Sequence, residues 1–205
     1  LAHQGITWAG EHLVSLFCYE PRTLPELLEH YQRSRQPTLM LVTQGRAAAA
    51  VSRHLALEHS HTEVTRVHRR GALAVVFLPN LAQTDFDHLL WASDMNFVRG
   101  EDSLVRALWA ARPFAWQIYP QGDNAHHAKL HAVLDALDAP QSWRRFHMVW
   151  NDMATGPLPQ PEPGHWGESA RRARAKLAGY SDLTTRLVEF VDKLSRGGQT
   201  GPKDR

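Results

Sequence analysis

The sequence of 205 residues predicts an α/β fold, in which a parallel sheet is covered by helices on both faces. About five short segments are almost continuously apolar, as strands buried on both faces of a sheet are. Segments with the apolar spacing of helices separate them, and this alternation is typical of parallel sheets. Because 43% of the residues are hydrophobic and 21% are charged, the composition is that of an ordinary globular protein.

In the first half of the chain, three strands are expected at residues 12–19, 38–42 and 72–78. A helix follows each strand. The first covers residues 24–33, with Thr23 as N-cap candidate and Pro25 in the first turn. The second covers residues 45–59, and the third begins at Thr84 or Asp85. Residues 60–70 are ambiguous, because Val64 and Val67 could belong to a short extra strand.

In the second half, strands are expected at residues 94–98 and 114–119. Helices are expected at 104–111, from the loop 120–123 to about 137, and at 141–153, 168–177 and 182–194. Four prolines between residues 155 and 167 indicate a linker or surface loop. We therefore expect one domain over residues 1–195, followed by a disordered tail over 196–205.

Several functional classes have no support in the sequence. The single cysteine, Cys18, excludes an internal disulfide and a CxxC pair, and a formal charge of +2 does not favour nucleic acid. The apolar runs are too short to span a bilayer, and no signal peptide is recognisable, so we expect a cytoplasmic protein. GxGxxG, GxxxxGK[ST] and HExxH are absent, and His127 and His131 lack an evident third partner, so we expect no metal.

The most informative stretch is the turn from Arg99 to Ser103, which follows an apolar strand and precedes a helix. Ligands of open α/β sheets bind at the carboxyl ends of strands, and helix N-termini suit phosphate. Gly100 would allow close approach, Glu101 or Asp102 could accept hydrogen bonds from sugar hydroxyls, and Ser103 could donate to a diphosphate. The plainer alternative is that Asp102 or Ser103 only caps the helix.

Three other segments should meet the same edge of the sheet: residues 17–19, 77–83 and 119–121. An aromatic side chain there can stack on a base, and the amide of Gln83 can pair with a pyrimidine edge. Phe17 and Phe77 could equally be ordinary core residues. Tyr19, Tyr119 and Gln121 are better candidates, because they stand just past apolar runs.

Specific motifs then point to a family. They are FCY at residues 17–19, LLW at 89–91, NFVRGEDS at 96–103, RPF at 112–114 and IYPQ at 118–121. In this order they resemble the bacterial protein-arginine rhamnosyltransferases that modify translation elongation factor P. The resemblance is close over residues 12–137. It implies a GT-B glycosyltransferase of two Rossmann-like domains, of which this chain is similar to the C-terminal half.

The resemblance implies an inverting transfer of rhamnose from dTDP-β-L-rhamnose to an arginine of elongation factor P, with no metal or cofactor. The N-terminal half of the family carries the catalytic aspartate, so the isolated chain is expected to be an inactive monomer. Matching residues would surround the thymine (Phe17, Tyr19, Phe77 and Gln83) or hold the ribose, diphosphate or sugar (Glu101, Asp102, Ser103 and Tyr119). Glu101 is the one most tied to activity.

The resemblance also implies that Arg99 orients the turn or offsets phosphate charge, and that Gly100 and Gln121 belong to the donor site. His126 and Lys129 match the family pattern too, although they could face solvent. One alternative is a non-catalytic nucleotide-binding or regulatory Rossmann-like domain, flavodoxin-like in plan. A second is an RNA- or DNA-binding module, suggested only by the pI near 8.9 and by the pairs Arg69–Arg70 and Arg171–Arg172.

Overall fold

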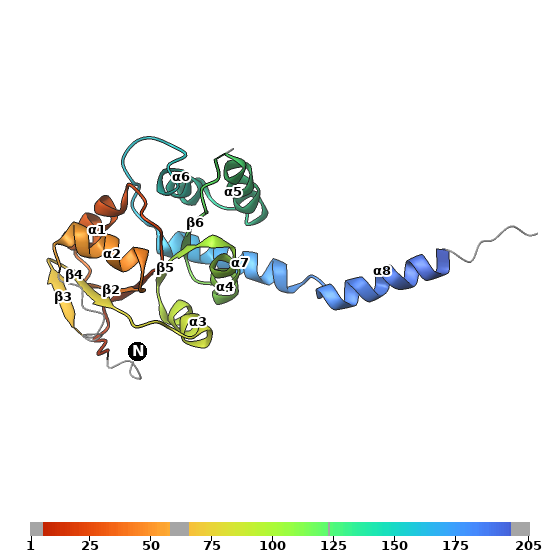
Figure 1. Ribbon diagram of the computed structural model, residues 1–205, viewed down its shortest axis with the longest axis horizontal. Helices are drawn as coiled ribbons and strands as arrows, with labels where there is room; N and C mark the ends of the chain where they lie inside the picture. Colours follow the sequence, from red (N-terminus) through yellow and green to blue (C-terminus); the bar gives the residue numbers. More distant parts are fainter. Residues whose placement is uncertain (1–5, 58–65, 123, 198–205) are drawn as a thin grey trace, which may run out of the picture.

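A six-stranded sheet in the order β3-β4-β2-β1-β5-β6 forms the centre of the computed structural model, which describes residues 6–57, 66–122 and 124–197 (Figure 1). Five strands are parallel: β1 (His12–Leu16), β2 (Thr38–Val42), β4 (Leu73–Phe77), β5 (Met95–Arg99) and β6 (Phe114–Gln117). The short β3 (Val67–Arg70) runs antiparallel to β4 at one edge. The expected extra strand is thus confirmed at Val67, whereas Val64 lies outside the described residues.

Helices cover both faces of the sheet, as expected. The described helices are α1 (Leu24–Arg33), α2 (Arg46–Leu55), α3 (Gln83–Ala92), α4 (Gly100–Ala110), α5 (Ala125–Ala136), α6 (Gln141–Trp150), α7 (Pro163–Ala178) and α8 (Leu183–Gly197). Because side chains alternate along a strand, Met40 and Val42 pack with α1 and α2, while Leu39 and Leu41 pack with Leu89 of α3. Figure 1 shows α1 and α2 on one side of the sheet and α3 on the other.

Helix α6 lies beside β6, the last strand of the sheet. Its fully buried Trp143, Phe146 and Trp150 pack with Trp166 of α7 and with Phe97 of β5. These large rings fill the space between the edge of the sheet and the helices of the C-terminal third. The proline-containing segment before Trp166 is therefore part of the domain, and α7 continues its core.

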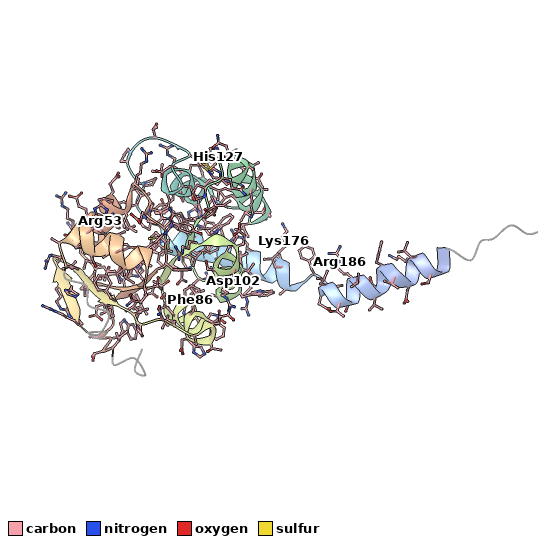
Figure 2. All side chains as sticks on the ribbon, in the orientation of Figure 1. Arg53, Phe86, Asp102, His127, Lys176 and Arg186 are labelled. Atoms are coloured by element: carbon pink, nitrogen blue, oxygen red, sulfur yellow. The ribbon has the colours of Figure 1, made fainter. Side chains whose placement is uncertain are left out.

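Helix α8 differs from the other helices because its apolar side chains are exposed. Leu183, Leu187, Phe190 and Leu194 are each more than half exposed, at 81%, 57%, 57% and 60%. Figure 2 shows Arg186 and its neighbours on α8 apart from the side chains that fill the domain. None of the described helices combines the length and apolar character that crossing a membrane requires.

Several expected boundaries were wrong at the helix ends. Helix α4 begins at Gly100 rather than at residue 104, and Arg99 is its N-cap residue without a side-chain cap, so neither Asp102 nor Ser103 caps it. Helix α3 begins at Gln83, before Thr84 and Asp85, also without a side-chain cap. Helix α7 begins at Pro163, inside the expected linker, because proline is compatible with a first helical turn.

The remaining differences are shorter elements. Strands β1 and β6 end at residues 16 and 117 instead of 19 and 119, so their last aromatic residues belong to loops. Helix α2 ends at residue 55, where Ala56 adopts a left-handed conformation, and α6 ends at residue 150. Thr23 precedes α1, but its hydroxyl makes no capping bond. Residues 198–205, most of the expected tail, lie outside the described residues.

Candidate functional site

The chain changes direction across the sheet between β1 and β5. From β1 it proceeds to β2 and β4 on one side, and it then returns to β5 on the other side. Loops that leave β1 and β5 at their carboxyl ends therefore diverge, and this is where open α/β sheets bind ligands. Leu16 pairs with Phe97 at this end, and the backbone N–H of Phe17 donates to the Phe97 carbonyl at 2.9 Å.

Four of the expected site residues meet at this position. The guanidinium of Arg99 lies over the rings of Phe17 and Tyr19, at 4.4 and 4.6 Å from their centroids. Tyr19 in turn makes an edge-to-face contact with Tyr119, with 5.8 Å between the ring centroids. Cation–π and aromatic contacts of this kind connect the loops that follow β1 and β6 to Arg99 at the end of β5. Phe17, Tyr19, Arg99 and Tyr119 thus form one cluster, as the sequence predicted.

Gly100 opens helix α4 in a conformation that favours glycine. Its φ of +65° lies in the left-handed region, and a Cβ built on it would come within 3.6 Å of the Tyr19 hydroxyl. Its carbonyl accepts a hydrogen bond of 2.8 Å from the indole N–H of Trp116. Since no side chain caps α4, the N–H groups of its first turn can donate to an anion, which the helix dipole also favours.

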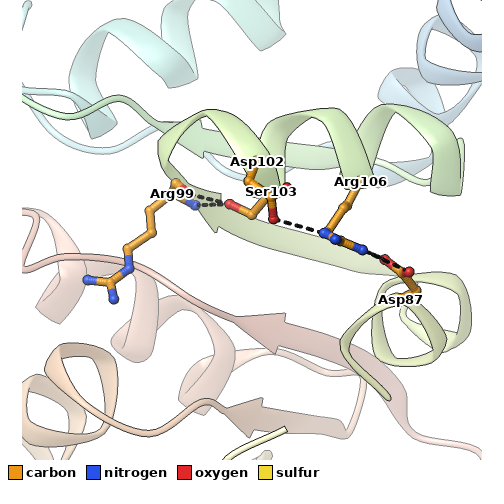
Figure 3. A network of polar contacts seen from close by, with 5 residues as sticks. All are labelled: Asp87, Arg99, Asp102, Ser103 and Arg106. Atoms are coloured by element: carbon orange, nitrogen blue, oxygen red, sulfur yellow. Dashed lines mark hydrogen bonds and ion pairs between the residues drawn. The ribbon is translucent and has the colours of Figure 1, made fainter. Parts of the chain in front are cut away.

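Ser103 serves the turn itself. Its buried hydroxyl accepts a hydrogen bond of 3.1 Å from the backbone N–H of Arg99 and donates to the Arg99 carbonyl (Figure 3). The sequence prediction had this hydroxyl donating to a diphosphate. In the structure the hydroxyl instead bonds to the backbone of Arg99 and so ties Arg99 to the first turn of α4. Ser103 lies four residues after Arg99, about one helical turn, so its hydroxyl can reach both the N–H and the carbonyl of Arg99.

Both carboxylates of the turn are paired with cations. Asp102 accepts a 2.8 Å hydrogen bond from Arg106, whose guanidinium also contacts both oxygens of Asp87 at 2.9 Å (Figure 3). This network joins α3 to α4. Glu101 pairs with Lys129 of α5 at 2.5 Å, and the hydrogen bond from Lys129 lowers the pKa of Glu101 below its ordinary value. Glu101 is therefore ionised at neutral pH.

His126 and Lys129 both have partners, although Lys129 is exposed and only His126 is buried. His126 is buried, and its Nδ1 accepts a hydrogen bond of 3.1 Å from the backbone N–H of Gln121. This bond fastens the loop after β6 to the start of α5. The side chain of Gln121 is exposed. Gln121 follows Tyr119 closely in the sequence and lies at the same carboxyl end of the sheet. By this position Gln121 remains a candidate site residue, although none of the ring and cation–π contacts among Phe17, Tyr19, Arg99 and Tyr119 includes it.

A cavity of about 180 Å³ opens next to the aromatic cluster, at the carboxyl ends of β1, β2 and β4. It is lined by Phe17, Thr43, Gln44, Pro79, Asn80, Leu81 and Phe86. Phe86 makes an edge-to-face contact with Phe17, with 5.5 Å between the ring centroids. The two aromatic rings and the Asn80 amide offer a flat heterocycle both aromatic contacts and hydrogen bonds, while the Gln44 amide donates to the Leu78 carbonyl at 2.6 Å.

Phe86 lines the cavity although the sequence did not single it out, whereas Phe77 and Gln83, which were expected around the thymine, do not line it. Phe86 was interpreted only as a residue on the apolar face of a helix, but it lies in the first turn of α3, where the loop from β4 ends. Phe77 is only 4% exposed and packs in the core and against His68 of β3, and it does not line the cavity. Gln83 is exposed at the start of α3 and is also outside the cavity lining.

Neither a reactive cysteine nor a metal-binding group of side chains provides a competing site among the described residues. Cys18 is fully buried between Phe17 and Tyr19, and burial raises the pKa of its thiol to about 12, so it is no nucleophile. Among residues 6–57, 66–122 and 124–197, no three His, Cys, Asp or Glu side chains are grouped as metal ligands would be. The chemistry of the described site therefore lies in backbone N–H groups, aromatic rings and paired charges.

Known proteins resemble this chain over most of its length. Residues 1–192 match the family model described as "Elongation-Factor P (EF-P) rhamnosyltransferase EarP". A protein-arginine rhamnosyltransferase of Pseudomonas aeruginosa is 42% identical over 193 residues, which cover 88% of this chain and 50% of that protein. Its counterpart in Shewanella oneidensis is 32% identical over 204 residues, covering 90% and 51%.

The fold is also that of a solved relative. A structure described as "Structural basis for EarP-mediated arginine glycosylation of translation elongation factor EF-P" superimposes with a TM-score of 0.79 at 34% identity. The match covers 94% of this chain and 64% of that one. The chain thus spans about half the length of the curated relatives that it matches. With most of its length matched by the family model, the chain belongs to the EarP family of EF-P rhamnosyltransferases.

Proposed function

We propose that this chain is the donor-binding half of a GT-B arginine rhamnosyltransferase, which transfers rhamnose from dTDP-β-L-rhamnose to an arginine of EF-P with inversion. The observation that carries the proposal is the arrangement at the carboxyl ends of the strands, where the order of the chain reverses between β1 and β5. The uncapped N-terminus of α4 follows β5 there, next to the Phe17–Tyr19–Tyr119 cluster, and the cavity lined by Phe17 opens on the side of β2 and β4. A pyrimidine nucleotide needs these two parts together: apolar edges for the base and N–H donors for the diphosphate.

In this proposal the thymine occupies the cavity between Phe17 and Phe86. The diphosphate lies at the first turn of α4, where the N–H groups of residues 100–102 donate to its oxygens. The rhamnose then lies near Glu101, whose carboxylate accepts hydrogen bonds from sugar hydroxyls. Ser103 contributes by holding the turn rather than by touching the phosphate.

The reaction is a single displacement at the anomeric carbon. The bond from that carbon to the dTDP oxygen breaks with its electron pair, and an arginine nitrogen forms the new bond on the opposite face. Negative charge grows on the leaving diphosphate, and the fixed N–H groups of α4 stabilise it without a metal. Because arginine is protonated at ordinary pH, a carboxylate must receive the guanidinium proton, and we assign it to the other half of the enzyme.

Isothermal titration calorimetry of the chain tests the donor assignment. We expect dTDP and dTDP-rhamnose to bind with at least tenfold higher affinity than FMN or ATP. Glu101→Gln should weaken dTDP-rhamnose about tenfold, because a hydrogen bond to a charged group contributes about 1.5 kcal/mol. It should affect dTDP less, because that ligand lacks the sugar. Lys193→Ala, at an exposed position on α8, is the control and should bind both ligands normally.

The rival interpretation, a non-catalytic nucleotide-binding domain, makes a different prediction for the same titrations. It would be favoured if FMN or ATP bound as tightly as dTDP, or if Glu101→Gln left the affinity for dTDP-rhamnose unchanged. A second measurement separates the transferase from a simple dTDP receptor. The chain should bind dTDP-rhamnose more tightly than dTDP-glucose, since only the first sugar is the proposed substrate.

A further inference from the structure

A hydrogen bond from a side chain of β6 holds the backbone of the Arg99–Ser103 turn. The indole N–H of Trp116, a fully buried residue of β6, donates to the Gly100 carbonyl at 2.8 Å. The peptide that follows Gly100 is planar and trans, so its carbonyl and the N–H of Glu101 point in opposite directions. Fixing the carbonyl toward β6 therefore fixes the direction of the Glu101 N–H, one of the first donors of α4.

Gly100 needs such a bond more than another residue would. A glycine at φ +65° has no Cβ to restrict its backbone, and neighbouring conformations are open to it. The first turn of α4 also lacks a side-chain cap that would orient its N–H groups. Ser103 fixes the peptide before Gly100 through Arg99, whereas Trp116 fixes the peptide after it.

Trp116 is itself fixed from the other side by α6. Its backbone N–H donates to Nε2 of His147 at 2.9 Å, and its carbonyl accepts from Nδ2 of Asn151 at 2.9 Å. Asn151 also accepts a hydrogen bond of 2.9 Å from the N–H of Ile118. Because β6 is the last strand of the sheet, these groups would otherwise have no partner strand. The side chains of His147 and of Asn151, the C-cap residue of α6, take the place of a seventh strand.

We propose that Trp116 is a positioning residue for the donor: its indole sets the N–H groups of the α4 turn that receive the diphosphate, and His147 and Asn151 hold it in register. This inference rests on the proposed function, because it assumes that the anion binds at α4. The positioning of the turn can nevertheless be measured without any ligand.

The chain contains a matched control for the indole. Trp143 is also fully buried and also donates its indole N–H to a backbone carbonyl, that of Phe114 at 2.6 Å. Phe114 is the first residue of β6. The turn faces the other end of this strand, three residues later. Trp116→Phe and Trp143→Phe therefore remove the same group from the same core, but only the first removes it from Gly100.

The experiment compares both variants by hydrogen exchange and by calorimetry with dTDP. We expect Trp116→Phe to speed exchange of the Arg99 amide, which donates to the Ser103 hydroxyl, about tenfold and to weaken dTDP binding about tenfold. Trp143→Phe should stay within twofold of the unaltered chain in both measurements. Asn151→Ala, at a half-exposed position, is the second variant if Trp116→Phe does not fold, and it should give a smaller change in the same direction.

The two proposals fail in different ways. If exchange of the Arg99 amide is unchanged in Trp116→Phe, or if both tryptophan variants weaken dTDP equally, the positioning role is wrong. If Trp116→Phe speeds exchange at the turn while the unaltered chain does not bind dTDP, the turn is positioned as inferred and the proposed function is wrong. Faster exchange together with normal dTDP affinity also overturns the inference, because binding of the diphosphate would then not depend on this turn.

Discussion

Replacing His147 by glutamine should change how the stability of the chain depends on pH. His147 is only 1% exposed, and both ring nitrogens have backbone partners at 2.9 Å. Nε2 accepts from the N–H of Trp116, so the ring proton must be on Nδ1, which donates to the Trp143 carbonyl. A second proton would turn Nε2 from an acceptor into a donor facing an N–H. It would also place a charge in the core.

The size of the effect follows from the pKa. Burial lowers the pKa of His147 from the ordinary value of 6.5 to about 4. Between these two pH values the unfolded chain binds a proton that the folded chain excludes, so stability falls as the pH falls. The stability that the uncharged His147 contributes is fully present above pH 6.5 and decreases by about 1.4 kcal/mol per pH unit below it. Near pH 4 the total loss is about 3 kcal/mol.

Urea unfolding followed by tryptophan fluorescence, from pH 8 to pH 4.5, measures this loss. His147→Gln keeps an acceptor for Trp116 but loses the bond to Trp143, so it should be about 1–2 kcal/mol less stable at pH 8. The difference between the two proteins should shrink below pH 6.5 and reverse near pH 5, since glutamine cannot be protonated. His165→Gln, at a largely exposed position on α7, is the control. Parallel pH profiles for His147→Gln and the unaltered chain would refute the reasoning.

Two further predictions concern single backbone and core positions. Gly100→Ala should lower stability by about 1 kcal/mol, because the left-handed conformation disfavours a Cβ even though the nearest atom is an acceptable 3.6 Å away; thermal unfolding measures this, and an unchanged melting temperature would contradict it. Tyr31→Phe should stabilise the chain by about 1 kcal/mol, because the buried Tyr31 hydroxyl has no partner within the described residues. A loss of stability in urea unfolding would mean that the hydroxyl is hydrogen-bonded after all.

The sheet could be predicted because its strands are buried on both faces. In β2 and β4 every residue is buried, so each gives a continuous apolar run that can be recognised without knowledge of its neighbours. The start of α4 could not be predicted in the same way. Gly100, Glu101 and Asp102 are typical turn residues, and they become helical because Ser103 closes the backbone at Arg99. That bond depends on a side-chain orientation that spacing alone does not fix.

The site was predictable to the extent that it is local in sequence. The Arg99–Ser103 turn, Phe17, Tyr19 and Tyr119 follow strands, and the carboxyl ends of parallel strands meet at one edge. Phe86 was missed because its place in an apolar helical pattern hides its contact with Phe17. The bond between Trp116 and Gly100 was missed because a tryptophan within a strand gives no sign of the carbonyl that its indole reaches.

The paired charges explain how two carboxylates can stand where an anion is proposed to bind. Unpaired, Glu101 and Asp102 would repel a diphosphate at the N-terminus of α4. Lys129 pairs with Glu101, while Arg106 is shared between Asp102 and Asp87, so these three carboxylates and two cations carry a net charge of −1, which Arg99 balances. If a diphosphate binds here as proposed, the field of the helix N-terminus acts on it against little opposing charge, and the Glu101 oxygens can accept hydrogen bonds from hydroxyl groups. In the proposed complex, Lys129 lets one turn hold a sugar and a phosphate at the same time.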